Sequence, residues 1–194
     1  MVSAAPRNGW SPRCDNAEEG VPVLSLGAIT SFHYRSSEFK RTSLYVPRET
    51  HIWLQPGDLL ITRSNTLELV GHAAIYDGNP SPCIYPDLIM RLELKNDCVD
   101  SRFVWYWLQS SSVREFISKH AKGTSPTMKK ISQGIVMSIP FPSMLTLSEQ
   151  RRIVAELDAL QSETGNLKRL QAETAAELGA LLPSILDRAF KGEI

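Results

Sequence analysis

Two acidic residues offer the most direct route to an enzymatic function, and their spacing decides whether they can act together. Pro86-Asp87 followed by Glu93-Leu94-Lys95 matches the residue order of a metal-dependent nuclease site. That chemistry requires both carboxylates on one metal ion, at about 2.0–2.6 Å from it. Asp87 and Glu93 fall on one predicted strand, where about 3.3 Å per residue separates them by roughly 20 Å. We therefore predict no catalytic residue and no metal site at this pair.

The other side chains able to perform catalysis do not form a known motif. The four histidines are scattered without metal-binding spacing. The chain contains no Gly-x-Ser-x-Gly elbow, no Gly-x-Gly-x-x-Gly loop, no Walker A loop and no Asn/Asp-Pro-Pro-Tyr/Phe run. Cys14, Cys83 and Cys98 form no Cys-x-x-Cys pair, which argues against a disulfide framework and a zinc site. The sequence thus predicts a protein that is not itself an enzyme and holds no cofactor.

The distribution of charge says more about partners than the net charge does. Lys and Arg number 21 and so do Asp and Glu, so the formal net charge is zero. Between Arg102 and Lys130, however, six basic residues accompany a single acid, Glu115. A second basic cluster, which includes Arg41, is diluted by acids. Basic patches on a neutral chain are compatible with DNA binding, although solvated faces look the same.

A polar loop inside the first of these clusters has the groups that bind phosphate. It combines one glycine and several hydroxyl groups with three lysines: Lys122, Thr124, Ser125, Thr127, Lys129 and Lys130. Backbone and hydroxyl donors flanked by ammonium groups suit phosphate oxygens. We predict that this loop contacts a nucleic-acid backbone.

A second polar cluster follows the short apolar run at residues 59–61, where a fold displays recognition groups. The cluster contains four candidate base-reading residues: Arg63, Ser64, Asn65 and Thr66. Arginine suits guanine and asparagine suits adenine by donor and acceptor geometry. The alternative, which is at least as well supported, is a turn in which Asn65 bonds to its own backbone.

The elements expected around these clusters indicate an α+β fold. Strands are predicted at residues 21–29, 59–61, 69–76, 88–94 and 131–139, separated by turns. Apolar residues at helical spacing predict one helix over residues 101–120. A mixed α/β globular domain should therefore position the two polar clusters.

The C-terminal part of the chain predicts one long amphipathic helix from Thr146 to about Leu182. Thr146 and Glu149 fit a capping box, and Pro183 is expected to end or kink the helix. About 36 residues make a rod of roughly 50 Å. Residues at steps of four and three form a coiled-coil seam interrupted by polar positions: Ile153, Leu157, Leu160, Thr164, Leu167, Leu178, Leu181 and Ile185. A rod of this length favours pairing with another helix, and a helix lying on its own domain is the alternative.

Three blocks of residues, in order, resemble the specificity subunit of type I restriction–modification systems. The first is Gly9-Trp10-Ser11-Pro12…Cys14 with Val23-Leu24-Ser25-Leu26. The second runs from Pro56-Gly57-Asp58-Leu59-Leu60-Ile61-Thr62-Arg63-Ser64-Asn65-Thr66 to Leu69-Val70-Gly71. The third begins with Gly123-Thr124-Ser125, Lys130-Ile131-Ser132 and Ile139-Pro140-Phe141-Pro142. It continues with Leu147-Ser148-Glu149-Gln150-Arg151-Arg152-Ile153-Val154 and ends with Ala189-Phe190-Lys191-Gly192-Glu193.

The resemblance implies a tail at residues 1–8, a target recognition domain at 9–143, and a spacer helix with a short C-terminal helix at 144–194. Family members usually contain two such domain–helix units, whereas this chain has one and lacks a signal for the strand that normally precedes the Gly-Trp-Ser-Pro block. The expected protein is thus a half-subunit that reads one half of a split site in double-stranded DNA. Its expected partners are a second copy, methyltransferase subunits that bring S-adenosylmethionine, and restriction motor subunits.

The class of protein that competes with this expectation is an interaction module. In that alternative the helix binds a partner and the domain has no DNA-reading activity, which the zero net charge favours. No apolar run approaches the length of a membrane span, and the N-terminus lacks a signal-peptide core. We therefore expect a cytoplasmic protein without a membrane segment.

Overall fold

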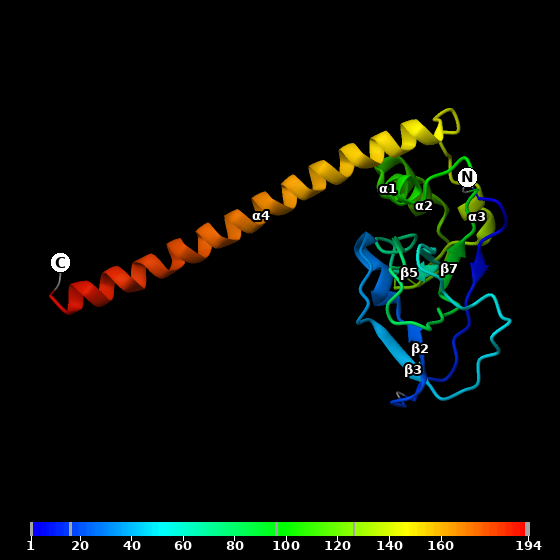
Figure 1. Ribbon diagram of the computed structural model, residues 1–194, viewed down its shortest axis with the longest axis horizontal. Helices are drawn as coiled ribbons and strands as arrows, with labels where there is room; N and C mark the ends of the chain where they lie inside the picture. Colours follow the sequence, from blue (N-terminus) through cyan, green and yellow to red (C-terminus); the bar gives the residue numbers. More distant parts are fainter. Residues whose placement is uncertain (1, 16, 96, 126, 193–194) are drawn as a thin grey trace. The chain divides into compact units, whose positions relative to one another are not determined.

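The computed structural model describes residues 2–15, 17–95, 97–125 and 127–192, and divides the chain into two units, residues 1–151 and 152–194. The first unit is a mixed α/β domain, and the second is one helix for most of its length (Figure 1). This confirms the predicted fold class. Glu193, which belongs to the last block of the family resemblance, lies outside the described residues.

A four-stranded antiparallel sheet forms the centre of the first unit. The strand β4 (Leu59–Thr62) pairs with β6 (Ala73–Ile75) on one side and with β7 (Ile89–Leu92) on the other. The strand β1 (Arg7–Asn8) extends the sheet beyond β7. All four residues of β4 are buried, because both faces of the sheet are covered.

The two faces of this sheet are covered by different hydrophobic cores. Consecutive residues of a strand point to opposite faces, and Leu60 accordingly belongs to a different core from Leu59 and Ile61. The Leu60 core contains residues from the strand β2 (Val21–Leu24) and the 3-10 helix η1 (Leu26–Phe32). Residues of the three short helices fill the other core. The predicted strand over residues 21–29 is therefore only half right, since it ends at Leu24.

The short helices differ from the prediction in two places. The predicted helix over residues 101–120 is two helices, α1 (Ser101–Gln109) and α2 (Ser111–His120), because Ser110 has an extended backbone between them. The predicted strand over residues 131–139 is wrong. That segment forms α3 (Gln133–Met137), and the Ser132 hydroxyl caps it by accepting a hydrogen bond from the amide of Ile135.

Two further pairs of strands complete the domain. The strand β2 pairs with β3 (Phe39–Thr42), and β5 (Ser64–Asn65) pairs with β8 (Lys129–Lys130). The predicted strand over residues 69–76 is reduced to β6, since residues 67–71 form turns. The predicted strand over 88–94 is confirmed as the shorter β7.

The N-terminal residues, predicted to be a tail without a strand, contribute β1 to the sheet. Arg7 and Asn8 lie opposite Arg91 and Met90 of β7. Gly9 allows this approach, because a Cβ atom there would lie 1.9 Å from the carbonyl oxygen of Tyr85. A two-residue strand has no periodic signal of its own and forms through this long-range pairing.

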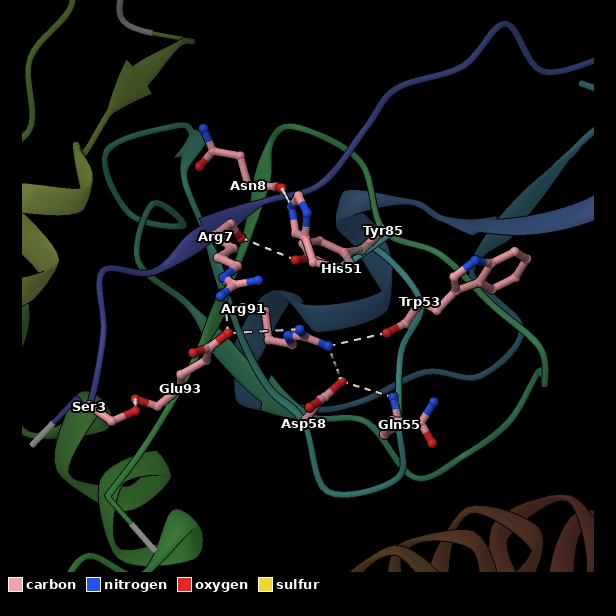
Figure 2. Close-up of polar contacts among 10 residues, drawn as sticks. All are labelled: Ser3, Arg7, Asn8, His51, Trp53, Gln55, Asp58, Tyr85, Arg91 and Glu93. Carbon is pink, nitrogen blue, oxygen red and sulfur yellow. Dashed lines mark hydrogen bonds and ion pairs between the residues drawn. The ribbon is translucent and has the colours of Figure 1, made fainter. Parts of the chain in front are cut away.

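Polar contacts tie β1, β7 and the turn before β4 together (Figure 2). The Arg91 guanidinium donates through Nη1 to the carbonyl of Trp53 at 3.1 Å and to Asp58 at 3.2 Å, and it lies 4.0 Å from Glu93. Glu93 also pairs with Arg7 at 3.0 Å. Asp58 in turn accepts a hydrogen bond from the amide of Gln55, which shapes the Pro-Gly-Asp turn. This network balances the charge of a half-buried arginine at the edge of the sheet.

The long helix α4 (Leu147–Phe190) begins as predicted. The amide of Thr146 donates to the Glu149 carboxylate at 2.8 Å, and the amide of Glu149 donates to the Thr146 hydroxyl at 3.3 Å, which confirms the capping box. Its predicted end at Leu182 and the separate short C-terminal helix are wrong, since Pro183 lies inside a helix that continues to Phe190. Figure 1 shows α4 without an interruption. Interior proline costs a helix one hydrogen bond but does not always end it.

The apolar seam of α4 is largely open to solvent in the described chain. Ile153 and Leu157 are half-buried, whereas the remaining leucine and isoleucine positions of the seam are exposed: Leu160, Leu167, Leu178, Leu181 and Ile185. Exposed large apolar side chains at coiled-coil spacing mark a surface that another helix can cover.

Candidate nucleic-acid interface

The ladder formed by β5 and β8 brings the two predicted polar clusters together. Ser64 lies opposite Lys130, and Asn65 lies opposite Lys129. Lys122 adds a third segment, since its amide donates to the Lys130 carbonyl at 2.9 Å and its carbonyl accepts from the Lys130 amide at 2.7 Å. Side chains predicted separately from two distant parts of the sequence therefore lie on adjoining strands.

The backbone of the first cluster is fixed on both sides. The amide of Arg63 donates to the carbonyl of Leu88 at 2.8 Å, and the carbonyl of Arg63 accepts from the amide of Ile131 at 3.0 Å. Ser64 is only 3% exposed, so its hydroxyl does not face solvent. The Asn65 side-chain oxygen accepts a hydrogen bond from the amide of Thr66 at 2.9 Å, which is the local backbone role named as the alternative. Asn65 and Thr66 are half-buried.

The turn that follows this cluster is held by a half-buried arginine of α2. Arg114 donates through Nη2 to the carbonyls of Glu68 and Val70, both at 2.9 Å, and its guanidinium lies 5.6 Å from the ring centre of Phe32. The ring of Phe32 also packs on His72 at 4.3 Å. Burial, followed by the charge of Arg114, lowers the pKa of His72 to about 4. A neutral His72 can thus accept the hydrogen bond from the amide of Ser31 at 2.9 Å.

The second cluster forms a loop whose hydroxyl groups are exposed. The Lys129 ammonium donates to the carbonyl of Gly123 at 2.7 Å and closes the loop on itself. Gly123 has a φ of 142°, and a Cβ atom there would lie 2.5 Å from the Met128 carbonyl oxygen. Ser125 and Thr127 join their hydroxyls at 2.9 Å. Like Thr124, these two residues are exposed, so the loop presents hydroxyl groups on a constrained backbone.

A cavity of about 460 Å³ opens beside the ladder. Its lining comes from three parts of the chain and contains one arginine and three lysines beside uncharged residues and a histidine: Arg63, Lys119, His120, Lys122, Lys130, Ile131, Ser132 and Ile135. Lys119 and His120 were not among the predicted site residues. Their signal in the sequence was their place in the last turn of a helix that leads directly into the lysine-rich loop.

Arg41, which was also predicted to contact DNA, lies on a different sheet from the other candidates. It belongs to β3, donates through Nη1 to the carbonyl of Gly20 at 2.7 Å, and lies 5.3 Å from the ring centre of Phe39. The structure therefore does not bring Arg41 onto the β5–β8 ladder.

The two carboxylates of the nuclease-like pattern have separate partners. Asp87 accepts a hydrogen bond from the hydroxyl of Ser11, whereas Glu93 pairs with Arg7 at 3.0 Å. Within residues 2–15, 17–95, 97–125 and 127–192, the structure contains no group of three or more His, Cys, Asp or Glu residues arranged to hold a metal ion. In the same described ranges, no helix is long and apolar enough to cross a membrane.

Comparison with known proteins identifies one family. The family model for the type I restriction modification DNA specificity domain matches residues 10–175. The specificity subunit of the type I restriction enzyme EcoKI from Escherichia coli (strain K12) is 26% identical over 194 residues, which are 97% of this chain and 40% of that protein. The StySPI specificity subunit from Salmonella potsdam is 26% identical over 188 residues, which are 96% of this chain and 40% of that protein.

Solved structures agree with this family in fold. One solved structure comes from work on the structural basis underlying complex assembly and conformational transition of the type I R-M system. Its chain is 27% identical to this one, with a TM-score of 0.69. The match covers 97% of this chain and 44% of that one. The crystal structure of the HsdS subunit from Thermoanaerobacter tengcongensis, at 23% identity and a TM-score of 0.55, shares the fold over 100% of this chain and 47% of its own. This chain thus spans less than half the length of these relatives.

Proposed function

We propose, from the premise that this chain belongs to the family of type I restriction modification DNA specificity domains, that it reads one half of a bipartite DNA site for a methyltransferase complex. The observation that carries this proposal is the pairing of β5 with β8, which places the half-buried Asn65 opposite Lys129 and next to the exposed Lys130, in a ladder that Lys122 connects to the loop with the exposed hydroxyl groups. Phosphate contacts position a protein on a duplex, and contacts to base edges specify the sequence. Both kinds of group adjoin each other on this ladder.

Each candidate side chain receives a role from its exposure and its contacts. Lys122 and Lys130 are exposed and suit phosphate oxygens, whereas Lys129 supports them by closing the loop. The proposed base readers include the exposed hydroxyl groups of the loop, which Thr124, Ser125 and Thr127 provide. The amide nitrogen of Asn65, which has no hydrogen-bond partner within the described residues, and the hydroxyl of Thr66 complete the set. The buried Ser64 and the distant Arg41 are not needed for this role.

The chemistry of modification is assigned to other proteins. The chain itself performs no catalysis in this proposal and holds no cofactor. Methyltransferase subunits bind it and bring S-adenosylmethionine, and restriction motor subunits join the complex when cleavage is required. The basis is the family to which the chain belongs and the separate partners of its carboxylates.

The seam of α4 is proposed to pair with the same seam of a second copy in antiparallel orientation. In one register of this pair, polar seam positions face polar ones and apolar positions face apolar ones, except at the centre of the helix. Four pairs of positions then meet between the two copies: Ile153 with Ile185, Leu157 with Leu181, Leu160 with Leu178, and Thr164 with Thr174. A shift by one heptad would place Thr174 against Leu157 and lose this match. With 44 residues, α4 is roughly 66 Å long, enough to separate half-sites about one helical turn, or roughly 34 Å, apart.

A methylation map of the host genome tests the proposal. A symmetric pair of readers predicts methylation at a symmetric, interrupted palindrome that disappears when this chain is deleted and returns with the wild-type gene. The triple variant Thr124→Ala, Ser125→Ala, Thr127→Ala should restore methylation at a changed or broader set of sites. A chain that still binds methyltransferase subunits but supports no sequence-specific methylation would identify it as an interaction module and overturn the proposal.

A further inference from the structure

We propose that the cavity beside the β5–β8 ladder is a fixed binding site for one phosphate group of the DNA backbone, and that Arg63 belongs to this site. The inference rests on the proposed function and deepens it. It places the phosphate contact that sets the position of the domain along the duplex in this cavity, separate from the residues proposed to read bases. It also changes the role of Arg63, which its residue type predicted to be a reader of guanine.

The geometry of the ladder brings two positive charges together. Lys122 and Lys130 exchange both backbone hydrogen bonds, at 2.9 Å and 2.7 Å, and are therefore directly opposite each other. Directly opposite residues of an antiparallel pair project their side chains from the same face, about 5.5 Å apart at Cα. Like charges in such a pair destabilise it. An anion held between the two ammonium groups would remove this repulsion.

No counter-ion within the described residues relieves these two lysines. The residues that line the cavity include no Asp or Glu. Glu115, the acid of α2, is already paired with Lys119 at 2.7 Å. His120 directs Nδ1 to the carbonyl of Phe116 at 2.8 Å, inside its own helix. Within the part of the chain that the structure describes, Arg63, Lys122 and Lys130 therefore have no acidic side chain among the residues that line the cavity with them, and the nearby acid Glu115 is used by Lys119.

The apolar part of the lining strengthens the attraction of the cavity for an anion. Ile131, which is 1% exposed, and the half-buried Ile135 both belong to this lining. Apolar atoms on one side of a charge cluster reduce the local screening by water. A phosphate oxygen can thus receive hydrogen bonds from the lysines in a partly desolvated site, where charge-assisted hydrogen bonds are strongest.

Arg63 is positioned to complete this site. Its backbone is fixed between Leu88 and Ile131, at 2.8 Å and 3.0 Å, and Arg63 is one of the residues that line the cavity. The guanidinium makes a hydrogen bond of 3.5 Å to the carbonyl of Asp87, at the outer limit of such bonds, so its remaining N–H groups are available for a phosphate oxygen. A side chain held in this cavity contributes affinity for every DNA sequence.

The experiment uses the full chain with its methyltransferase subunits and a duplex that contains its site. Single methylphosphonate linkages are scanned along both strands, and binding is measured for the wild type and for the double variant Lys122→Gln, Lys130→Gln. The control variant Lys40→Gln, Lys95→Gln removes two exposed lysines outside the cavity. We expect one linkage whose neutralisation weakens the wild type by about tenfold or more and leaves the double variant unchanged.

The salt dependence and the Arg63 variant give independent measurements. The double variant should reduce the slope of log Kobs against log salt by about 0.9 for the lost phosphate, and the control variant should not. Arg63→Gln should weaken binding by the same factor on the cognate duplex and on duplexes with each base pair substituted. Lys130→Arg, which retains the positive charge, should bind as the wild type does and excludes misfolding as the cause.

Several outcomes would overturn the inference. The first is that every methylphosphonate linkage that weakens binding by the wild type also weakens binding by the double variant. The second is that Arg63→Gln relaxes the preference for one base pair. Competition by inorganic phosphate at constant ionic strength, combined with insensitivity to every methylphosphonate, would assign the cavity to free phosphate instead. Failure of the proposed function is distinct, since the wild type would then show no sequence-specific DNA binding at all.

Discussion

Replacement of Gln150 by leucine should destabilise the globular unit more than any other change of similar size in the first turn of α4. Gln150 is 1% exposed, and all of its polar atoms are bonded. Its Oε1 accepts from the amide of Asp100 at 3.0 Å, and its Nε2 donates to the carbonyls of Cys98 and Leu145 at 3.0 Å and 3.1 Å. Asp100 in turn caps α1 through its side chain. One residue of α4 thus connects the loop before α1 with the turn before α4.

The size of the effect follows from the groups that leucine leaves without a partner. Each of the three hydrogen bonds contributes about 1 kcal/mol net, and each buried backbone group left unsatisfied costs about 1–3 kcal/mol. Leucine has a similar volume and opens little space for a water molecule to replace the amide. We therefore expect a loss of about 3–5 kcal/mol, which is a large part of the roughly 5–15 kcal/mol available to a domain of this kind.

Urea unfolding followed by tryptophan fluorescence measures this loss. Trp107 is a suitable reporter, because its indole donates to the carbonyl of Pro140 at 2.8 Å and lies on α1. The matched control is Gln133→Leu, the same change at an exposed position of α3, which should alter stability by less than about 0.5 kcal/mol. Protein concentration is held constant, since pairing of helices would add to the apparent stability. If Gln150→Leu and Gln133→Leu have the same midpoint, the hydrogen bonds of Gln150 do not hold this turn.

Three further predictions test other parts of the structure. Gly9→Ala should cost about 1–3 kcal/mol in urea unfolding, because its Cβ would overlap backbone atoms, whereas Gly165→Ala, in open space on α4, should be neutral or stabilising by up to about 1 kcal/mol. His72 has its folded pKa at about 4, below the unfolded value of 6.5, so the unfolded chain binds a proton first as pH falls. Stability should decline by about 1–2 kcal/mol between pH 6.5 and 4, after allowance for partial exposure, and His72→Asn should remove this decline. The proposed antiparallel pairing places Leu157 of one copy opposite Leu181 of the other. In a cysteine-free background, a mixture of Leu157→Cys and Leu181→Cys chains should therefore form disulfides between the two variants. Disulfides formed by either variant with itself would instead indicate parallel helices.

The sequence predicted elements where short-range signals agree and failed where long-range contacts decide. The start of α4 was correct because Thr146 and Glu149 satisfy each other's amides within one turn. The apolar run at residues 131–139 fits either period, and of its buried residues Val136 lies in α3 whereas Ile131 and Ile139 flank that helix. The strand β1 had no local signal, since two residues acquire a strand conformation only from β7.

The candidate site was predicted by residue type but not by geometry. Lysines and hydroxyls between residues 122 and 130 suggested phosphate contacts, and residues 63–66 suggested base contacts, but nothing in the sequence indicated that they pair as β5 and β8. The same limit applies to exposure. The hydroxyl of Ser64 is buried and the carbonyl of the Asn65 side chain is occupied, which only the folded chain reveals. Lys119 entered the site for the same reason, through the position of the end of α2.

Three residues of the blocks that resemble the family hold the fold, and the proposed readers of DNA lie between them in the sequence. Gly9 permits β1 to approach its neighbour, Asp58 shapes the turn before β4, and Gln150 ties the start of α4 to the loop before α1. Each of these roles needs one residue type, so substitutions there are costly. The loop that carries Lys122 and Lys130 is different, because these lysines and the hydroxyl residues Thr124, Ser125 and Thr127 are exposed. Its hydroxyls can change without loss of either core. A change of sequence preference should therefore come from this loop with little effect on stability, whereas changes at the three structural residues should affect stability first.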